Sequence, residues 1–117
     1  IYNAADVTAV PSQQDNLPNT MVESLSCGTP VVGFNVGGIP DLVKDGETGF
    51  LAPAGNIGAL SAAFVEAFAD TERLQTYGKQ GRALVETVCA PDVQAKAYLN
   101  LYEKVIDSAQ HHNISRL

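Results

Sequence analysis

Residues 7–34 read VTAVPSQQDNLPNTMVESLSCGTPVVGF and determine the fold that we expect. The run 7–10 is short, β-prone and stopped by a proline, which predicts a buried strand. Residues 11–18 form a polar loop bounded by prolines, and the apolar spacing over 19–27 is typical of a helix. A glycine follows this helix, and the continuous apolar run 30–34 predicts a second buried strand. The stretch therefore favours two parallel strands joined by a helix.

The alternation of strand and helix continues beyond this stretch. Gly37 and Gly38 predict a tight turn, residues 39–43 a short helix with proline in its first turn, and residues 48–51 a third brief strand. Such an order is typical of a parallel sheet with helices on both faces. We therefore expect an α/β fold, a partial Rossmann-like parallel sheet flanked by helices, with a helical C-terminal segment.

The second half of the chain carries three helical patterns. Asn56 is placed to cap the first, and the third follows Pro91. The second spans about residues 72–88, and we expect Gly78 and Gly81 to weaken it because glycine disfavours helix interiors. The apolar stripe expected for the first of these helices consists of Ile57, Leu60, Phe64, Ala67 and Phe68.

Length and charge exclude several classes of protein. The chain has 117 residues, which is enough for one domain. No apolar run approaches the roughly 18 residues of a membrane span. Seven Lys and Arg against 13 Asp and Glu give a net charge of −6. Because an acidic domain without a basic cluster binds polyanions poorly, we expect no nucleic-acid partner.

The cysteines and histidines do not form a recognisable metal motif. Cys27 and Cys89 lie far apart and are not part of a C-x-x-C pair, which argues against a disulfide framework or a zinc ribbon. Reduced, buried thiols in a cytoplasmic protein are the expectation. The adjacent pair His111 and His112 is more typical of a solvated tail than of a metal site.

The loop before the first helix and the first turn of that helix carry the best candidates for ligand binding. Asp15 and Glu23 can both face the carboxyl end of the first strand, where open α/β sheets bind ligands. Asn19 is placed to cap the helix, and the amides of Asn19, Thr20 and Met21 are expected to be free to bind a phosphate. Glu23 suits the two hydroxyls of a ribose. The residues alone leave a second interpretation, with Asp15 as a turn residue and Glu23 as a solvated helix residue.

These residues belong to a longer pattern that resembles a known family. The pattern reads P-S-x-x-D-x7-E-S-L-x-C-G-T-P-V-V over 11–32, G-G-I-P-D-L-V over 37–43 and G-x-x-G-F-L over 46–51. It closely resembles the nucleotide-sugar half of retaining GT-B glycosyltransferases of glycosyltransferase family 4, the group 1 glycosyl transferases. The resemblance extends over about residues 2–107.

The resemblance implies a role for each matched position. Asp15 matches the first carboxylate of the E-x7-E motif, which faces the donor sugar and its reacting centre, and Glu23 matches the second, which holds the ribose hydroxyls. Gly37 and Gly38 match a glycine pair near the nucleotide, although turn geometry alone would also account for them. The stretch that reaches the sugar and the diphosphate through its backbone amides corresponds to Asn16, Leu17, Pro18, Asn19, Thr20 and Met21.

The resemblance also implies the reaction. The family transfers a sugar from a nucleoside diphosphate sugar to an acceptor, with retention of configuration and without an essential metal. We therefore expect a hexosyltransferase that uses a nucleotide sugar as substrate and needs no cofactor. Two positions depart from the pattern, since Asp15 replaces the commoner Glu and Pro18 the commoner Gly, which removes one amide donor. These departures leave the identity of the donor open.

We expect other parts of such an enzyme to lie outside this chain. Residues 1–117 match the C-terminal portion of the nucleotide-sugar-binding domain, and residues 1–6 read as the end of a helix already begun. The phosphate-binding Arg and Lys and the N-terminal domain with the acceptor site would precede Ile1. The isolated chain is therefore expected to be inactive. The open edges of its sheet predict self-association as a dimer.

Three further questions stay open in the sequence. The expected location is cytoplasmic, with peripheral association with a membrane through the absent N-terminal domain as the alternative. A non-catalytic binding or structural module would carry the same elements. A fragment of a GT-B sugar-nucleotide epimerase would share the same architecture.

Overall fold

The computed structural model describes the backbone of residues 1–114 and the side chains of residues 1–110. The expectation for His111 and His112 therefore falls outside the described side chains. The chain divides into two compact units, Ile1–Glu86 and Thr87–Leu117, and each is described by itself. The elements are η1 (Tyr2–Ala4), β1 (Thr8–Val10), α1 (Asn19–Ser26), β2 (Val31–Phe34), α2 (Ile39–Leu42), β3 (Gly49–Ala52), α3 (Ile57–Ala69), α4 (Thr71–Val88) and α5 (Pro91–Ile114).

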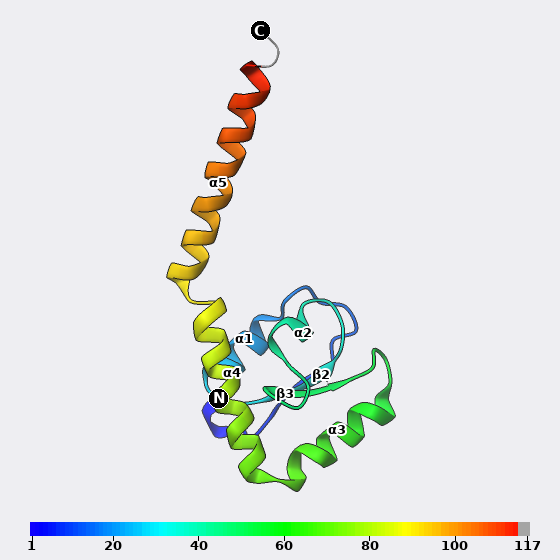
Figure 1. The fold of residues 1–117 in the computed structure, drawn as a ribbon. Coiled ribbons are helices and arrows are strands. Elements are labelled where there is room, and N and C mark those ends of the chain that lie inside the picture. The colour runs from blue at the N-terminus through cyan, green and yellow to red at the C-terminus, as the bar shows by residue number, and fades with distance from the viewer. Residues whose placement is uncertain (115–117) are drawn as a thin grey trace. The chain divides into compact units, whose positions relative to one another are not determined.

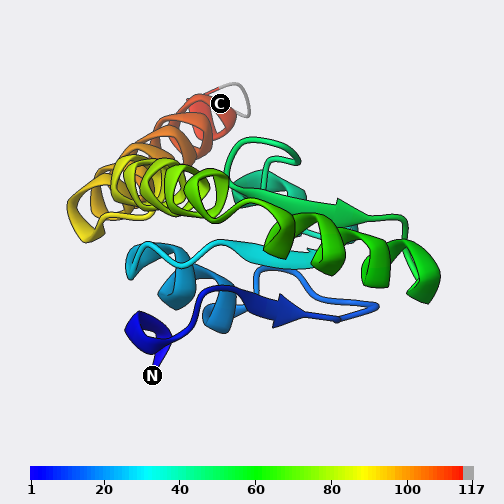
Figure 2. The ribbon, with the colours of Figure 1, turned by 90° about the horizontal axis from the view of Figure 1, so that it is seen from below.

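The first unit is built on a three-stranded parallel sheet in the order β1-β2-β3 (Figure 2). Thr8 lies opposite Val31, and Val32 lies opposite Phe50. The helices α1 and α2 lie on one face of the sheet and α3 lies on the other (Figures 1 and 2). This arrangement confirms the predicted α/β fold. Because the strands are parallel, the loops after β1, β2 and β3 all begin where the carboxyl ends of the strands lie, which is the carboxyl edge of the sheet.

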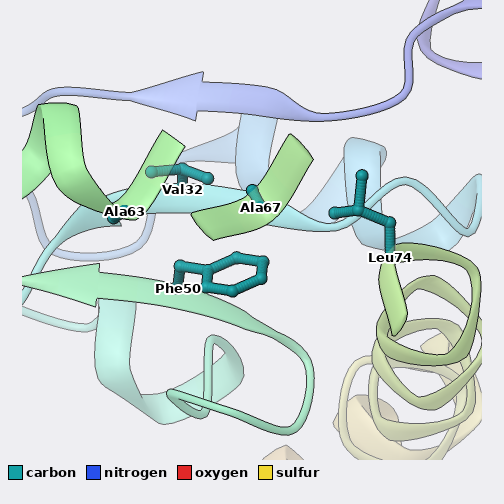
Figure 3. Packing of buried hydrophobic residues seen from close by; sticks show 5 residues of the cluster. All are labelled: Val32, Phe50, Ala63, Ala67 and Leu74. Atoms are coloured by element: carbon teal, nitrogen blue, oxygen red, sulfur yellow. The ribbon is translucent and has the colours of Figure 1, made fainter. Parts of the chain in front are cut away.

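On the α3 face, small side chains bring the helix close to the sheet. Ala63 and Ala67 take the centre of the contact, with Leu60 and Phe64 partly buried beside them. The predicted stripe is wrong at Ile57 and Phe68, which are 74% and 58% exposed, because the two alanines occupy the sheet-facing centre. The buried cluster that Figure 3 shows consists of Val32, Phe50, Ala63, Ala67 and Leu74.

The opposite face of the sheet holds a buried hydroxyl contact. The Ser24 hydroxyl of α1 donates a hydrogen bond and lies 2.8 Å from Thr8 Oγ1 and 2.9 Å from the Thr29 carbonyl oxygen. These contacts fix α1 to the start of β1 and to the turn before β2. The fully buried apolar side chains of the chain include Met21, Leu25, Val31, Ile39 and Val43.

The helix α4 packs through the two glycines that the sequence suggests would weaken it. A Cβ on Gly78 would overlap the carbonyl oxygen of Gly28, and a Cβ on Gly81 would lie 2.7 Å from Leu25 Cδ2. Cβ atoms in proteins essentially never lie this close to another heavy atom. The weakening of the helix stays a prediction, and the structure shows in addition that these glycines allow α4 to approach the end of α1.

The two cysteines are free, which confirms that they do not pair with each other. The expectation of buried thiols is wrong for Cys27, which is exposed. Its position explains the exposure, because Cys27 is the C-terminal cap of α1 while the buried face of that helix is formed by Met21, Ser24 and Leu25.

The outer edge of β3 is partly covered by the turn that precedes it. The amide of Leu51 donates to Asp45 Oδ1 at 2.9 Å, and Asp45 forms an isolated parallel bridge with Gly49. Lys44 stabilises this turn by donating from Nζ to the carbonyl oxygen of Pro40 at 2.7 Å. The expectation of two bare edges is therefore wrong for β3. Self-association through the edge of β1 stays a prediction.

The helix α5 makes up most of the second unit. Its side chains are exposed over residues 91–110. The rings of Tyr98 and Tyr102 pack against each other with centroids 6.3 Å apart. Within the described part of the chain, no helix combines the length and apolar character that crossing a bilayer requires.

The glycine contact of α4 gives a prediction for stability. We expect Gly78→Ala to lower the free energy of unfolding by about 1–3 kcal/mol, because the added methyl group collides with the backbone of Gly28. Urea denaturation followed by circular dichroism measures the change. Gly58→Ala in α3 is the matched control, since its Cβ would meet Asn56 Oδ1 at an ordinary 3.5 Å. Equal stability of Gly78→Ala and the unaltered chain would contradict the packing.

Candidate functional site

The loop between β1 and α1 leaves the carboxyl edge of the sheet and carries Asp15 (Figure 2). The Asp15 side chain is half-buried, whereas Asn16 and Leu17 are exposed. Pro18, at the end of the loop, is buried and precedes the first residue of α1. The loop thus has a fixed end at the helix and an exposed middle.

The first turn of α1 is capped differently from the prediction. Pro18 is the N-cap, and Asn19 is the first residue of the helix. No side chain makes a capping hydrogen bond at this end. The extended conformation of Pro18 allows its carbonyl oxygen to accept from the amide of Met21 at 3.1 Å and from that of Val22 at 3.3 Å. The prediction of a free Met21 amide is therefore wrong, and the Met21 side chain is fully buried.

Two amide donors remain at this helix end. Among the described residues, none accepts a hydrogen bond from the backbone amide of Asn19 or Thr20. Both residues are exposed, and the dipole of the helix adds partial positive charge at the same position. Over residues 1–60 the only Lys or Arg is Lys44, whose ammonium group donates to Pro40. The arrangement can therefore hold an anion through backbone amides.

The glycine pair after β2 lies directly against the loop that carries Asp15. Gly37 has a positive φ of 53°. A Cβ on Gly37 would overlap the carbonyl oxygen of Asp15, and one on Gly38 would overlap that of Asn16. The structure thus brings together two segments that both leave the carboxyl edge of the sheet. The sequence pattern predicts a turn at the pair but does not predict this contact.

Glu23 lies further along α1, with its side chain exposed. The Tyr2 hydroxyl is its neighbour. Partial burial, a hydrogen bond to the Glu23 carboxylate and the negative charges of Glu23 and Cys27 raise the pKa of Tyr2 above its ordinary value. Tyr2 is not among the predicted site residues. It precedes β1, and no local pattern links it to a helix that begins 17 residues later at Asn19.

A separate hollow of about 210 Å³ lies near the amino ends of the strands. None of the predicted site residues lines it. Within the described part of the chain, no group of three or more His, Cys, Asp and Glu side chains is placed to hold a metal ion. The lining residues of the hollow are Asp6, Gly28, Pro30, Phe68, Thr71, Leu74 and Gln75.

Comparisons with solved structures agree with this architecture. Sucrose-phosphate synthase from Thermosynechococcus elongatus is 34% identical with a TM-score of 0.83, over 92% of this chain and 27% of that protein. HepE from Anabaena, in complex with UDP-glucose, is 29% identical with a TM-score of 0.69, over 74% of this chain and 24% of that protein. HepE has also been solved with UDP.

Sequence comparisons identify the family. D-inositol 3-phosphate glycosyltransferase from Gordonia bronchialis is 31% identical over 113 residues, which are 97% of this chain and 24% of that relative. The chain thus spans about a quarter of the length of this curated relative. The family of glycosyl transferases group 1 matches residues 1–84. The structural neighbours are GT-B glycosyltransferases. The family match over residues 1–84 shows that the chain belongs to the glycosyl transferases group 1.

Proposed function

We propose that this chain supplies the donor-binding part of a retaining glycosyltransferase. The enzyme would transfer a hexose from a nucleoside diphosphate sugar to an acceptor. Membership of the group 1 glycosyl transferases and the likeness to HepE, solved with UDP-glucose, support the proposal. The acceptor would be bound by an N-terminal domain outside this chain, so the isolated chain would not turn over substrate.

The observation that carries the proposal is the pair of unpaired amides at the start of α1. Asn19 and Thr20 present these donors at the carboxyl edge of the sheet, where ligands of open α/β sheets bind. A diphosphate needs hydrogen-bond donors, and the surrounding half of the chain offers almost no cationic side chains. The helix end is therefore the natural position for the diphosphate of the donor.

The two carboxylates then have separate tasks on either side of the diphosphate. Asp15, in the loop before these amides, would orient the sugar and stabilise positive charge at its reacting carbon in an oxocarbenium-like transition state. Glu23, on α1 after them, would accept hydrogen bonds from the ribose hydroxyls. The amides of Asn19 and Thr20 would stabilise the departing diphosphate. The proposal includes no metal ion and assigns the contacts with the phosphates to backbone amides.

The ribose role of Glu23 is tested by removing its charge. We expect Glu23→Gln to weaken UDP binding by about 1.5–3 kcal/mol, the range for hydrogen bonds to a charged group. Isothermal titration of the chain with UDP measures the change, and added chelator should leave the affinity unaltered. Glu47→Gln is the matched control, since it removes the same charge from the exposed turn before β3. Equal affinities of Glu23→Gln and the unaltered chain would contradict the proposal.

The sugar role of Asp15 is tested by comparing two ligands. We expect Asp15→Asn to weaken binding of UDP-glucose by about 1.5–3 kcal/mol while the affinity for UDP changes little, because UDP lacks the group that Asp15 contacts. Parallel titrations with UDP and UDP-glucose measure the difference. Asp6→Asn, an exposed site before β1, controls for the lost charge. An equal loss for both ligands would place Asp15 away from the sugar.

The contact between Tyr2 and Glu23 makes a prediction about pH. In Glu23→Gln we expect the pKa of Tyr2 to fall toward its ordinary value of 10.0, with the part caused by burial retained. Carbon-13 NMR titration of labelled tyrosine measures it, and Glu47→Gln should leave Tyr2 unaltered. Because the folded chain holds this proton more tightly, the linked stability is complete below about pH 10 and is lost as the pH rises through the raised pKa.

A further inference from the structure

We propose that Gly37 and Gly38 are positioning residues for the donor sugar, acting through the backbone of Asp15 and Asn16. They set where the Asp15 loop lies and thereby direct its carboxylate toward the sugar. The inference rests on the proposed function of Asp15. It assigns the glycine pair a task that needs no direct contact with the nucleotide.

The two glycines are required for different geometric reasons. Gly37 has a φ of 53°, a backbone conformation that residues with a side chain rarely adopt. A Cβ on Gly37 would also overlap the Asp15 carbonyl oxygen and lie 2.8 Å from the Asp15 carbonyl carbon. Gly38 has an ordinary φ of −87°. A Cβ on Gly38 would nevertheless overlap the Asn16 carbonyl oxygen and lie 3.3 Å from Leu17 Cδ1. Space alone therefore requires glycine at Gly38.

The turn that contains the glycines is held from both sides and cannot easily withdraw. The Asn35 amide before it donates to the Ala52 carbonyl oxygen of β3 at 2.8 Å. Ile39 after it is fully buried, and its amide donates to the carbonyl oxygen of Val36 at 3.1 Å. A methyl group added to the turn must therefore displace the opposite segment.

The opposite segment is the part of the site that can move. Asn16 is exposed, and Leu17 is 42% exposed. The following helix is anchored by the fully buried side chains of Met21 and Leu25, so the displacement ends before Glu23. A substitution in the glycine pair should accordingly disturb recognition of the sugar and leave the ribose site on α1 in place.

Gly38→Ala tests this separation, with Gly55→Ala as its control. Gly55 has a positive φ of 72° and no atom within 4 Å of an added Cβ, so its substitution introduces strain without a collision. Gly37→Ala combines strain and collision. For each variant of the full 117-residue chain, amide NMR spectra report the position of the loop, and titrations with UDP and UDP-glucose report binding.

We expect Gly38→Ala to shift the amide signals of residues 15–17 and to weaken UDP-glucose binding about tenfold or more, the loss of a hydrogen bond to a charged group, while UDP affinity changes less than twofold. Gly55→Ala should leave the amide signals of residues 15–17 and the affinities for both ligands unaltered. Unaltered signals at residues 15–17, or an equal loss of affinity for both ligands, would overturn the inference.

Two further outcomes keep the inference separate from the proposed function. If the unaltered chain binds neither ligand, the donor-binding proposal fails, and the Gly38→Ala shifts alone decide whether the pair positions the loop. If Gly38→Ala does not fold, nuclear Overhauser contacts in the unaltered chain decide whether the glycine pair positions the Asp15 loop. Contacts between the Cα protons of Gly38 and the methyl protons of Leu17 would support the inference, and their absence would overturn it.

Discussion

Close contact between backbones at glycine positions is the constraint on which the rest of this structure depends. The carbonyl oxygen of Gly28 lies where a side chain on Gly78 would stand, so α4 can pack on the end of α1. The carbonyl oxygens of Asp15 and Asn16 lie in the same relation to Gly37 and Gly38. One contact holds a helix and the other holds the loop of the candidate site. In both, the absence of a Cβ allows two segments to meet at a distance that no other residue permits.

The order of the elements could be predicted because each has a local cause. Apolar runs before and after the helix over residues 19–26 mark β1 and β2, and Asn56 accepts from the amide of Ala59 at 2.9 Å as a cap should. Packing between distant segments could not be predicted. Helix propensity marks Gly78 and Gly81 as weak points, and only the tertiary contact shows why glycine is needed there.

The candidate site shows the same limit. The spacing of Asp15 and Glu23 and the helix between them follow from local pattern and family resemblance. Which amides stay unpaired depends on the conformation of Pro18, whose carbonyl oxygen accepts from Met21. The neighbour of Glu23 is Tyr2, which reaches it only through tertiary folding. Backbone conformation and long-range contact thus supply what residue type and spacing leave undetermined.

The turn before β3 partly covers the outer edge of that strand, so the two lateral edges of the sheet differ in how readily they can pair with an added strand. Asp45 accepts from the amide of Leu51, a donor that an added strand would otherwise use. Hydrogen bonding to a further strand is therefore favoured at β1 and hindered at β3. If β1 of a second copy added there, the pairing would use the β1 edge of both molecules. Pairing of this kind would close at two subunits, and further growth would have to use the partly covered edge of β3.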